Sequence, residues 1–359
     1  MMLSYDITEH GAPLQSRVRQ IPTPTGSEVV VRITHSGVCH SDVHFWKGYF
    51  DLGGGKKAFL SDRGIRPPIT MGHEPLGIVS SVGPDVRTVS PGEKRLVYPW
   101  LGCGKCWACE LGKTTLCVTP KAIGVALPGG FATHLLVPDA KYLVSTDGVD
   151  DAFAATLACS GVTSYSAVNK LLPLALEGDW VAVVGCGGLG LLAISILRAL
   201  GFEQVIACDV DDSKLQAAIA QGAARTLRTD SPQASAELAK LAEGRLAGVA
   251  DFVGIPTTFQ LGYLALRRGG AYVLVGLHGG DIQLPLPPVA QRGISILGSY
   301  VGTLQDLEAV VNLARSGKLR QTPVELRPAD QVTETLRQLE ESRGVGRTVL
   351  DFASISADT

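Results

Sequence analysis

Eight consecutive residues, Gly37 to His44, gather several side chains that can do chemistry: one thiol, two imidazoles, a hydroxyl and a carboxylate. Cys39 is a potential metal ligand, Ser41 can hydrogen-bond a substrate hydroxyl, and His44 can pass a proton to water. Short clusters of Cys and His arise by chance in long chains, so the interpretation depends on partners elsewhere. Three later segments supply such partners: Gly72–Glu74, Leu157–Cys159 and the glycine-rich turn Gly185–Gly190.

Four cysteines follow one another with the spacing C-x2-C-x2-C-x7-C. Two-residue gaps let successive thiolates converge on one tetrahedral ion, and a fourth thiolate from a nearby turn closes the site. Because four sulfur ligands leave no open position, the spacing predicts a structural zinc site and not a catalytic one. An iron–sulfur cluster also uses four thiolates, but nothing else in the sequence indicates electron transfer. The predicted ligands are Cys103, Cys106, Cys109 and Cys117.

A glycine-rich turn with the pattern G-x-G-x-x-G lies between a predicted strand and a predicted helix. Its glycines permit a tight turn and let the backbone approach a pyrophosphate, which lies at the positive end of the helix. Asp209 ends the next predicted strand, where a carboxylate meets the ribose hydroxyls and repels the 2′-phosphate of NADP. The sequence therefore predicts NAD as cofactor. The predicted contacts are Gly185, Gly187, Gly188, Leu189, Gly190, Asp209 and Lys214.

The elements that must position these groups change character along the chain. Up to about residue 150 the sequence shows short β-branched strands, such as Val29–Thr34 and Gly77–Gly83, joined by turns rich in Gly and Pro. After about residue 151, apolar strands such as Trp180–Val184 alternate with helices such as Leu189–Leu200. Strands that are apolar on both faces are typical of a parallel sheet covered by helices. The predicted fold class is α/β, with a β-rich domain and a doubly wound parallel sheet.

Composition limits the classes of function. The 359 residues carry 32 basic and 34 acidic side chains, so the formal net charge of -2 gives no reason to expect nucleic acid or a membrane surface as partner. No export signal or membrane-spanning run is apparent, which favours a cytoplasmic protein. In that compartment the 8 cysteines are expected to be reduced thiols or metal ligands instead of disulfides.

Taken together, these motifs resemble the zinc-containing alcohol dehydrogenases of the medium-chain dehydrogenase/reductase superfamily. The resemblance runs nearly end to end, and the segment Ile294–Gly302 looks particularly like the microbial tetrameric enzymes of the yeast type. It implies a GroES-like catalytic domain over residues 1–160, to which residues 299–359 return, and a Rossmann NAD-binding domain over residues 161–298. It also implies a homotetramer, with a homodimer as the alternative.

The resemblance implies that Cys39, His73 and Cys159 hold a catalytic zinc with one open position. Two thiolates and one imidazole would leave the ion Lewis-acidic, as in other open sites. Such an ion lowers the pKa of a bound alcohol, so that its alkoxide can give hydride to the nicotinamide. Taken alone, Cys159 would more often be a small buried residue. With the structural site, two zinc ions are expected in each subunit.

In the family, the alcohol proton leaves through Ser41, the nicotinamide ribose and His44. Ser41 could instead cap a helix, and His44 could be an ordinary surface histidine. Asp42 is expected to orient His73 by a hydrogen bond, unless it only begins the same helix. Glu74 is expected beside the zinc, and a structural ion pair is its alternative role.

The resemblance also places three further residues against NAD. His40 and Arg347 would face the pyrophosphate, for which an arginine is suited by its two-pronged guanidinium. A solvated surface arginine is the alternative for Arg347. Thr163 is expected against the nicotinamide ring.

The interval from His44 to His73 is longer than expected for yeast-type enzymes, and the excess lies in residues 49–64 of the connection over residues 46–70. Long connections in compact domains are often functional, so this one is expected to be a loop that shapes the substrate cleft. Trp46 and Trp100 are candidate pocket walls, with core aromatics as the alternative. An apolar pocket would suit medium-chain or aromatic alcohols.

The predicted function is a reversible, zinc-dependent transfer of hydride from an alcohol to NAD, giving an aldehyde or ketone. A polyol or hydroxy-acid dehydrogenase of the same superfamily is the nearest alternative, although Cys159 stands where the polyol enzymes tend to have a glutamate. A non-catalytic NAD-binding structural protein is the alternative from a different class. Turnover of any alcohol would separate it from the enzymes.

Overall fold

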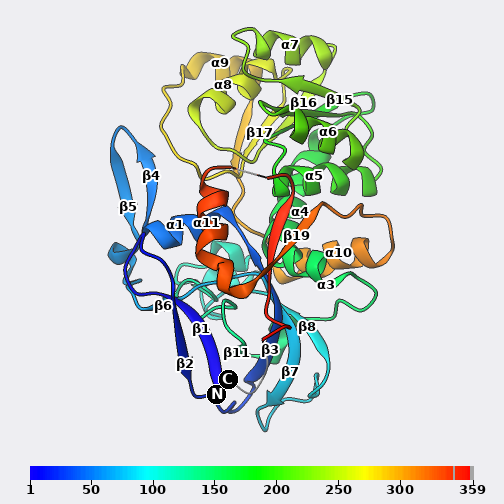
Figure 1. The fold of residues 1–359 in the computed structure, drawn as a ribbon. Helices are drawn as coiled ribbons and strands as arrows, with labels where there is room; N and C mark the ends of the chain where they lie inside the picture. The colour runs from blue at the N-terminus through cyan, green and yellow to red at the C-terminus, as the bar shows by residue number, and fades with distance from the viewer. Residues whose placement is uncertain (343, 356–359) are drawn as a thin grey trace.

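The computed structural model describes residues 1–342 and 344–355, and within them the strands divide into a β-rich half and one parallel sheet (Figure 1). The β-rich half is built around β3 (Val29–Val38), which pairs antiparallel with β7, β11 and β20. Its other strands are β1 (Met2–Ile7), β2 (Gln15–Arg19), β6 (Ile69–Thr70), β7 (Pro75–Val82), β8 (Lys94–Val97), β9 (Trp100–Leu101), β10 (Lys121–Ala122), β11 (His134–Val137), β12 (Leu143–Val144), β19 (Val324–Pro328) and β20 (Arg347–Asp351).

The parallel sheet has the strand order β15-β14-β13-β16-β17-β18. Its chain order starts at the centre, moves to one edge and then crosses to the other, which is the doubly wound arrangement with a crevice beside β13. The strands are β13 (Trp180–Val184), β14 (Val205–Asp209), β15 (Arg225–Arg228), β16 (Leu246–Asp251), β17 (Ala271–Leu274) and β18 (Ser295–Gly298). This sheet and the β-rich half confirm the predicted α/β fold.

Helices cover the parallel sheet and connect it to the β-rich half (Figure 1). The α-helices are α1 (His40–Lys47), α2 (Trp107–Glu110), α3 (Asp151–Thr156), α4 (Val162–Leu171), α5 (Gly188–Ala199), α6 (Asp212–Gln221), α7 (Ala234–Leu241), α8 (Pro256–Ala265), α9 (Leu286–Arg292), α10 (Leu304–Arg315) and α11 (Val332–Glu340). The short helices are η1 (Leu60–Arg63), η2 (Thr114–Leu116), η3 (Ala140–Tyr142), η4 (Leu157–Gly161), η5 (Leu172–Leu174) and η6 (Ala329–Gln331). In the described part of the chain, none is long and apolar enough to cross a membrane.

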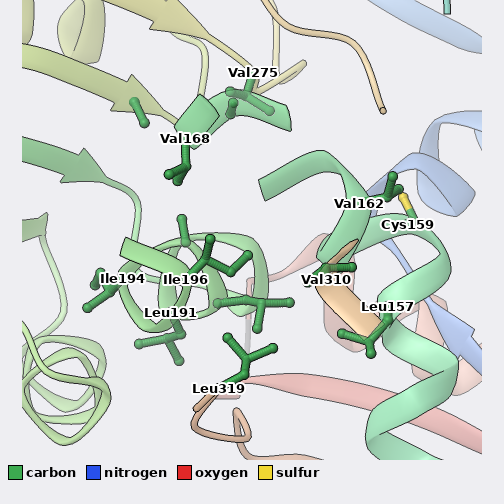
Figure 2. Packing of buried hydrophobic residues seen from close by; sticks show 14 of the residues in the cluster. Leu157, Cys159, Val162, Val168, Leu191, Ile194, Ile196, Val275, Val310 and Leu319 are labelled. Atoms are coloured by element: carbon green, nitrogen blue, oxygen red, sulfur yellow. The ribbon is translucent and has the colours of Figure 1, made fainter. Parts of the chain in front are cut away.

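One helical run joins the two halves. It passes from α3 through the π-helical turn η4 into α4, and Leu157 and Val162 on it are buried in the same apolar cluster as Leu191 of α5 and Val310 of α10. Figure 2 shows Cys159 on this run. The packing on both sides of Cys159 fixes where its thiol can lie.

The connection over residues 46–70 is not the loop that the sequence suggested. It contains a hairpin of β4 (Tyr49–Gly53) and β5 (Lys56–Phe59), followed by η1. Three consecutive glycines, residues 53–55, have positive φ and form the turn between the strands. Glycine adopts positive φ without steric cost, which permits this tight connection.

Candidate active site and cofactor cleft

Asp42 joins the start of α1 to His73. One carboxylate oxygen accepts a hydrogen bond from the backbone N–H of Cys39 at 2.9 Å, and the other lies 2.9 Å from Nδ1 of His73. Since the carboxylate accepts this bond, Nδ1 carries the hydrogen, and the neutral form of the ring then presents the lone pair of Nε2. Asp42 therefore both caps the helix and orients the imidazole, so its two predicted roles coexist.

Four buried side chains converge where α1, His73 and the π-helical turn meet. The potential ligand atoms of Cys39, His73, Glu74 and Cys159 all lie within 4.8 Å of one another. Nε2 of His73 is buried and has no hydrogen-bond partner among the described residues, as expected for an atom meant to bind an ion. Two thiols and one imidazole are a ligand set that suits zinc. The residues present therefore fit the ion that the sequence predicts.

The surroundings act oppositely on the two thiols of this cluster: they favour the thiolate of Cys39, whereas the hydrogen bond to Cys39 and burial raise the pKa of Cys159 well above its usual value. The Cys159 thiol donates to Cys39 Sγ at 3.9 Å and, with His73, lowers the pKa of Cys39 well below its usual value against the opposing effect of burial. The thiolate is the form that binds a metal. Burial raises the pKa of Glu74 to about 7, although Arg347 acts in the opposite direction.

Arg347 connects this cluster to the glycine-rich turn. Its Nη2 donates to both carboxylate oxygens of Glu74 at 2.6 Å, and only 7% of the residue is exposed, so it is not a solvated surface arginine. A Cβ built on Gly188 would lie 2.1 Å from Cδ of Arg347. The Arg347 side chain thus runs along the glycine-rich turn toward Glu74, and its guanidinium pairs with the Glu74 carboxylate.

The four cysteines of the second cluster lie in a lobe formed by α2 and η2. Their sulfur atoms are all within 4.8 Å of one another, and none forms a disulfide. The backbone N–H of Cys103 donates to Cys117 Sγ at 3.2 Å, which helps to hold that sulfur in place. The four sulfurs, from Cys103, Cys106, Cys109 and Cys117, match the predicted structural zinc site.

A cavity of about 380 Å³ lies between the carboxyl edge of the parallel sheet and the C-terminal strands. A Cβ on Gly190 would lie 1.9 Å from the carbonyl oxygen of Gly185, so α5 can begin this close to the turn only without a side chain. Gly187, in contrast, has nothing within 4 Å of such a Cβ and faces open space. The predicted cofactor contacts that line the cavity are His40, Gly185, Gly187, Gly188, Leu189, Gly190, Asp209, Lys214 and Arg347.

Asp209 is held rigidly at the end of β14. Its Oδ2 accepts from the backbone N–H of Cys186 in the glycine turn at 2.7 Å, and its Oδ1 accepts from the N–H groups of Val210 and Asp211. These bonds keep a negative charge at one end of the cavity. A carboxylate there can accept hydrogen bonds from ribose hydroxyls, as the sequence predicts.

Comparisons with known proteins agree with this geometry. Residues 25–147 match the family described as "Alcohol dehydrogenase GroES-like domain", and residues 188–316 match "Zinc-binding dehydrogenase". An NAD-dependent alcohol dehydrogenase of Sulfurisphaera tokodaii is 34% identical over 97% of this chain and 99% of its own. The chain belongs to the zinc-binding alcohol dehydrogenases. It is an oxidoreductase of this zinc-binding family, and the name of the Sulfurisphaera tokodaii relative gives NAD as the cofactor of that enzyme.

Two other relatives illustrate the range of this family. The alcohol dehydrogenase of Pyrobaculum aerophilum, solved with cobalt and zinc, superposes with a TM-score of 0.84 at 28% identity, covering 98% of this chain and 99% of that one. A D-arabinose 1-dehydrogenase (NADP(+)) of Saccharolobus solfataricus is 33% identical over 94% of this chain and 94% of its own. Membership of the family therefore leaves the choice of substrate open.

In this dehydrogenase the two predicted pocket tryptophans have different surroundings. The ring of Trp100 lies 5.3 Å from that of His73, and its indole N–H donates to the carbonyl of Ala158 at 3.2 Å. Trp46 packs in the core of the β-rich half and donates to the carbonyl of Ala12 at 2.7 Å, which favours its alternative role as a core aromatic.

The residues predicted for proton transfer and nicotinamide contact, Ser41, His44 and Thr163, are not among those that line the cavity. Ser41 and His44 are half-buried on α1, and the ring of Phe50 covers His44 at 4.7 Å. Burial, and then His278, lowers the pKa of His44 to about 4, so its imidazole is neutral near pH 7 and can accept a proton. The hydroxyl of Thr163 is buried without a partner among the described residues.

Sequence reasoning missed His278, which follows β17 and lines the cavity. Its ring lies 4.4 Å from that of His40, and its Nδ1 lies 2.9 Å from the carbonyl oxygen of Val253. A single histidine between glycines gives no motif. Its position at the carboxyl end of a parallel strand, where ligands bind in such sheets, was the available signal.

Proposed function

We propose that this chain catalyses the reversible oxidation of an alcohol to an aldehyde or ketone at the cluster of Cys39, His73 and Cys159, with NAD in the adjoining cavity. The observation that supports this most directly is the placement of three metal-ligand side chains within 4.8 Å of one another, beside the turn that lines the cavity. Arg347 spans the short interval between the two, so substrate and cofactor would meet there.

The three ligands are assigned to a catalytic zinc, which when bound would act as a Lewis acid that lowers the pKa of the alcohol while NAD accepts the hydride. Asp42 holds the His73 ring so that Nε2 faces the cluster. Glu74 stays beside the ligands because Arg347 neutralises it, and it is available as a further ligand. The four cysteines of the lobe are assigned to a second, structural zinc.

The proton of the alcohol is assigned to a route along α1. Ser41 would accept it near the cluster, and His44 would carry it toward water, with the ribose of NAD between them. His44 lies one helical turn from Ser41 and is only half-buried, with the ring of Phe50 against it. Burial, His278 and Lys47 all disfavour the charged form of this imidazole, so His44 would hold the proton only briefly before passing it to water.

The cofactor contacts are assigned along the length of the cavity. Asp209 and Lys214 would bind the adenosine ribose, and the turn from Gly185 to Gly190 the pyrophosphate. His40 and Arg347 would face the same pyrophosphate from the β-rich half. Thr163 would contact the nicotinamide, with its unpaired hydroxyl.

Aromatic rings beside the ligands favour a medium-chain or aromatic alcohol as substrate. Trp100 lies next to His73, and Tyr300 lies 6.0 Å from Trp100. Two alternatives remain to be tested: a polyol or hydroxy acid, for which the likeness to a D-arabinose dehydrogenase is the supporting observation, and a non-catalytic NAD-binding role.

We also propose a homotetramer in the cytoplasm, with a homodimer as the alternative. Two surfaces with exposed apolar side chains support self-association: the edge strand β18 with Ile296, and the four-cysteine lobe. On the lobe these side chains are Trp107, Leu111, Leu116 and Val118. Light scattering after gel filtration should give about four times the chain mass of 37.7 kDa.

The test of the main proposal is NADH formation at about pH 8–9, where release of the alcohol proton is favoured. Zinc-replete protein would be offered linear, branched and aromatic alcohols, polyols and hydroxy acids. We expect turnover that a zinc chelator abolishes, and that Cys159→Ser removes while Cys208→Ser, a buried thiol outside the cluster, retains it. Turnover that survives both the chelator and Cys159→Ser would contradict the assignment.

A further inference from the structure

The β4–β5 hairpin is attached directly to the helix that carries His40 and His44. It begins two residues after α1 ends, and Phe50 of β4 packs against His44 at 4.7 Å and Phe45 at 6.1 Å. Lys57 on β5 lies 3.7 Å over the ring of Tyr49 on β4, which braces the two strands. The hairpin therefore follows any movement of α1. Figure 1 shows it projecting from the β-rich half alongside the parallel-sheet half.

The tip of the hairpin touches the parallel-sheet half. A Cβ built on Gly53 would lie 2.7 Å from the backbone nitrogen and Oδ1 of Asp281. From the other side, a Cβ on Gly279 would lie 2.4 Å from the carbonyl oxygen of Asp51. Both contacts pack backbone against the opposing segment and leave no room for a side chain. The hairpin tip and the loop of residues 278–281 are thus fitted to each other.

This loop is fastened to its neighbour in the parallel sheet. The N–H groups of His278 and Gly279 donate to the carbonyls of Val253 and Gly254 at 3.3 and 3.1 Å. His278 adds a side-chain contact, because its Nδ1 lies 2.9 Å from the same Val253 oxygen.

The turn after β16 that carries Val253 and Gly254 is itself held by Asp251, which is fully buried at the end of β16. Its Oδ1 accepts from the N–H groups of Val253 and Gly254 at 2.8 and 3.0 Å. Its Oδ2 accepts from the hydroxyls of Thr258 and Tyr272 at 2.8 and 2.5 Å. With four donors on one carboxylate, the hairpin meets a rigid surface.

A second contact crosses between the halves at the cavity itself. His40 from α1 and His278 from the loop face each other with ring centroids 4.4 Å apart, and both line the cavity. Asp209 ends β14 and His278 follows β17, and these strands lie on opposite sides of β13 in the strand order. The two histidines therefore close the end of the cavity that is distant from Asp209.

We propose that the hairpin tip and the loop of residues 278–281 form an inter-domain clasp that closes the cavity and sets the rate at which NADH leaves, with His278 as a positioning residue. The inference rests on the proposed assignment of this cavity to NAD. Widening the cavity requires separation of Gly53 from Asp281, of Asp51 from Gly279 and of the two histidine rings. In enzymes of this kind, opening and product release often limit turnover.

The hairpin provides a matched pair of variants. Gly53→Ala introduces a Cβ against Asp281, whereas Gly55→Ala introduces one with nothing within 4 Å, and both glycines have similar positive φ values of 82° and 78°. Backbone strain is therefore common to the two, and only the first disturbs the clasp. In stopped-flow displacement of NADH, we expect Gly53→Ala to release NADH about three- to tenfold faster, since changes at one interface act mainly on dissociation. Gly55→Ala should match the parent.

The loop offers the reciprocal pair. A Cβ on Gly279 meets Asp51 of the hairpin, whereas a Cβ on Gly280 meets Pro256 of its own half at 2.7 Å. Gly279→Ala should speed release as Gly53→Ala does, and more than Gly280→Ala. His278→Ala should also speed release, and His278→Phe, which retains an aromatic ring against His40, should restore it in part.

The possible outcomes distinguish a wrong clasp proposal from a wrong assignment of the cavity to NAD. If Gly53→Ala and Gly279→Ala release NADH at the rates of their controls, with unfolding temperatures showing folded proteins, the clasp is wrong even though NADH binds. If the parent chain does not bind NADH at all, the cavity assignment and the clasp both fail. If release is faster in both variants and in His278→Ala, the clasp stands.

Discussion

The carboxylate of Asp42 serves two neighbours, and the same is true of other side chains in the site. One oxygen of Asp42 holds the first turn of α1 and the other holds His73. Arg347 neutralises Glu74 and lies along the glycine turn. Such shared contacts place each reactive atom from two sides, which restricts it to one geometry. Substitutions at these positions should therefore disturb the orientation of the neighbouring side chains more than the charge of the site.

Asp209 gives a prediction at this scale. Replacing it with glycine removes the negative charge that would repel the 2′-phosphate of NADP, so Asp209→Gly should narrow the preference for NAD over NADP about tenfold or more, or roughly 1.4 kcal/mol. The measurement is the ratio of kcat/KM values for the two cofactors. Asp212→Gly, at an exposed carboxylate on α6, is the control. An unchanged ratio in Asp209→Gly would remove Asp209 from the ribose site.

Individual residues also show how far the sequence could lead. Cys39, His73 and Cys159 were expected to be neighbours through the family resemblance, because the sequence around Cys159 alone favours a small buried residue. The contact between Glu74 and Arg347 joins positions 273 residues apart, and nothing in the local sequence of either indicates the other. His278 was missed for the same reason. Contacts that depend on the path of the chain in space leave no local pattern.

At the scale of elements, the strand–turn–helix unit from β13 to α5 makes the clearest prediction. Gly190→Ala drives a Cβ into the carbonyl of Gly185, so it should lower the unfolding temperature strongly and abolish NAD binding. Gly187→Ala faces open space and should fold like the parent. If Gly187 approaches the pyrophosphate, that variant should still bind NAD more weakly. Calorimetry and NADH fluorescence titration measure the two effects, and equal unfolding temperatures would contradict the steric argument.

The hairpin shows why element prediction was incomplete. Its strands are only five and four residues long, and several of their side chains are exposed, so no alternation of apolar and polar residues marks them. The length of the connection suggested a loop, although its three glycines also permit a tight turn. By contrast, β13 and α5 were predicted nearly to the residue, since their burial is continuous and their length is typical.

Asp179 links β13 to the turn that precedes β17, and it makes folding stability depend on pH. Burial would raise its pKa, but hydrogen bonds from Arg267 and from the Leu176 N–H outweigh burial, so the pKa lies below the usual value. A lowered carboxyl pKa stabilises the fold above the unfolded pKa of about 3.9, and this contribution is lost as the pH falls through the folded pKa.

Asp179→Asn should therefore cost about 1–3 kcal/mol of unfolding free energy at pH 7 and progressively less below about pH 4. Denaturant unfolding at pH 7 and at pH 3 measures the difference in unfolding free energy between Asp179→Asn and the parent. Asp230→Asn is the matched control, because that carboxylate pairs with Arg228 at an exposed site. A penalty at pH 3 as large as that at pH 7 would mean that ionisation of Asp179 is not the source.

For the whole molecule, the four-cysteine lobe links metal content to assembly. Cys106→Ser removes one of four ligands and should reduce the zinc content from two ions to one per subunit. Because Trp107 and Leu111 are exposed on the lobe, its distortion should also lower the unfolding temperature and the assembled mass. Activity per remaining folded subunit should change least. Mass measurement, metal analysis and thermal unfolding test this, and unchanged thermal stability would show that the structural site is misassigned.

The position of β20 determines the order in which the halves can be completed during synthesis. β20 pairs with β3, in the middle of the large sheet, yet it is translated after the whole parallel sheet. The parallel-sheet strands, from Trp180 to Gly298, are contiguous and can pair as soon as they leave the ribosome. Until β20 arrives, the end of β3 from His35 to Val38 lacks this partner, although β11 already pairs with Val29 to Arg32, and Arg347 is absent from Glu74. The nascent chain therefore acquires its cofactor-binding half before its metal cluster is enclosed.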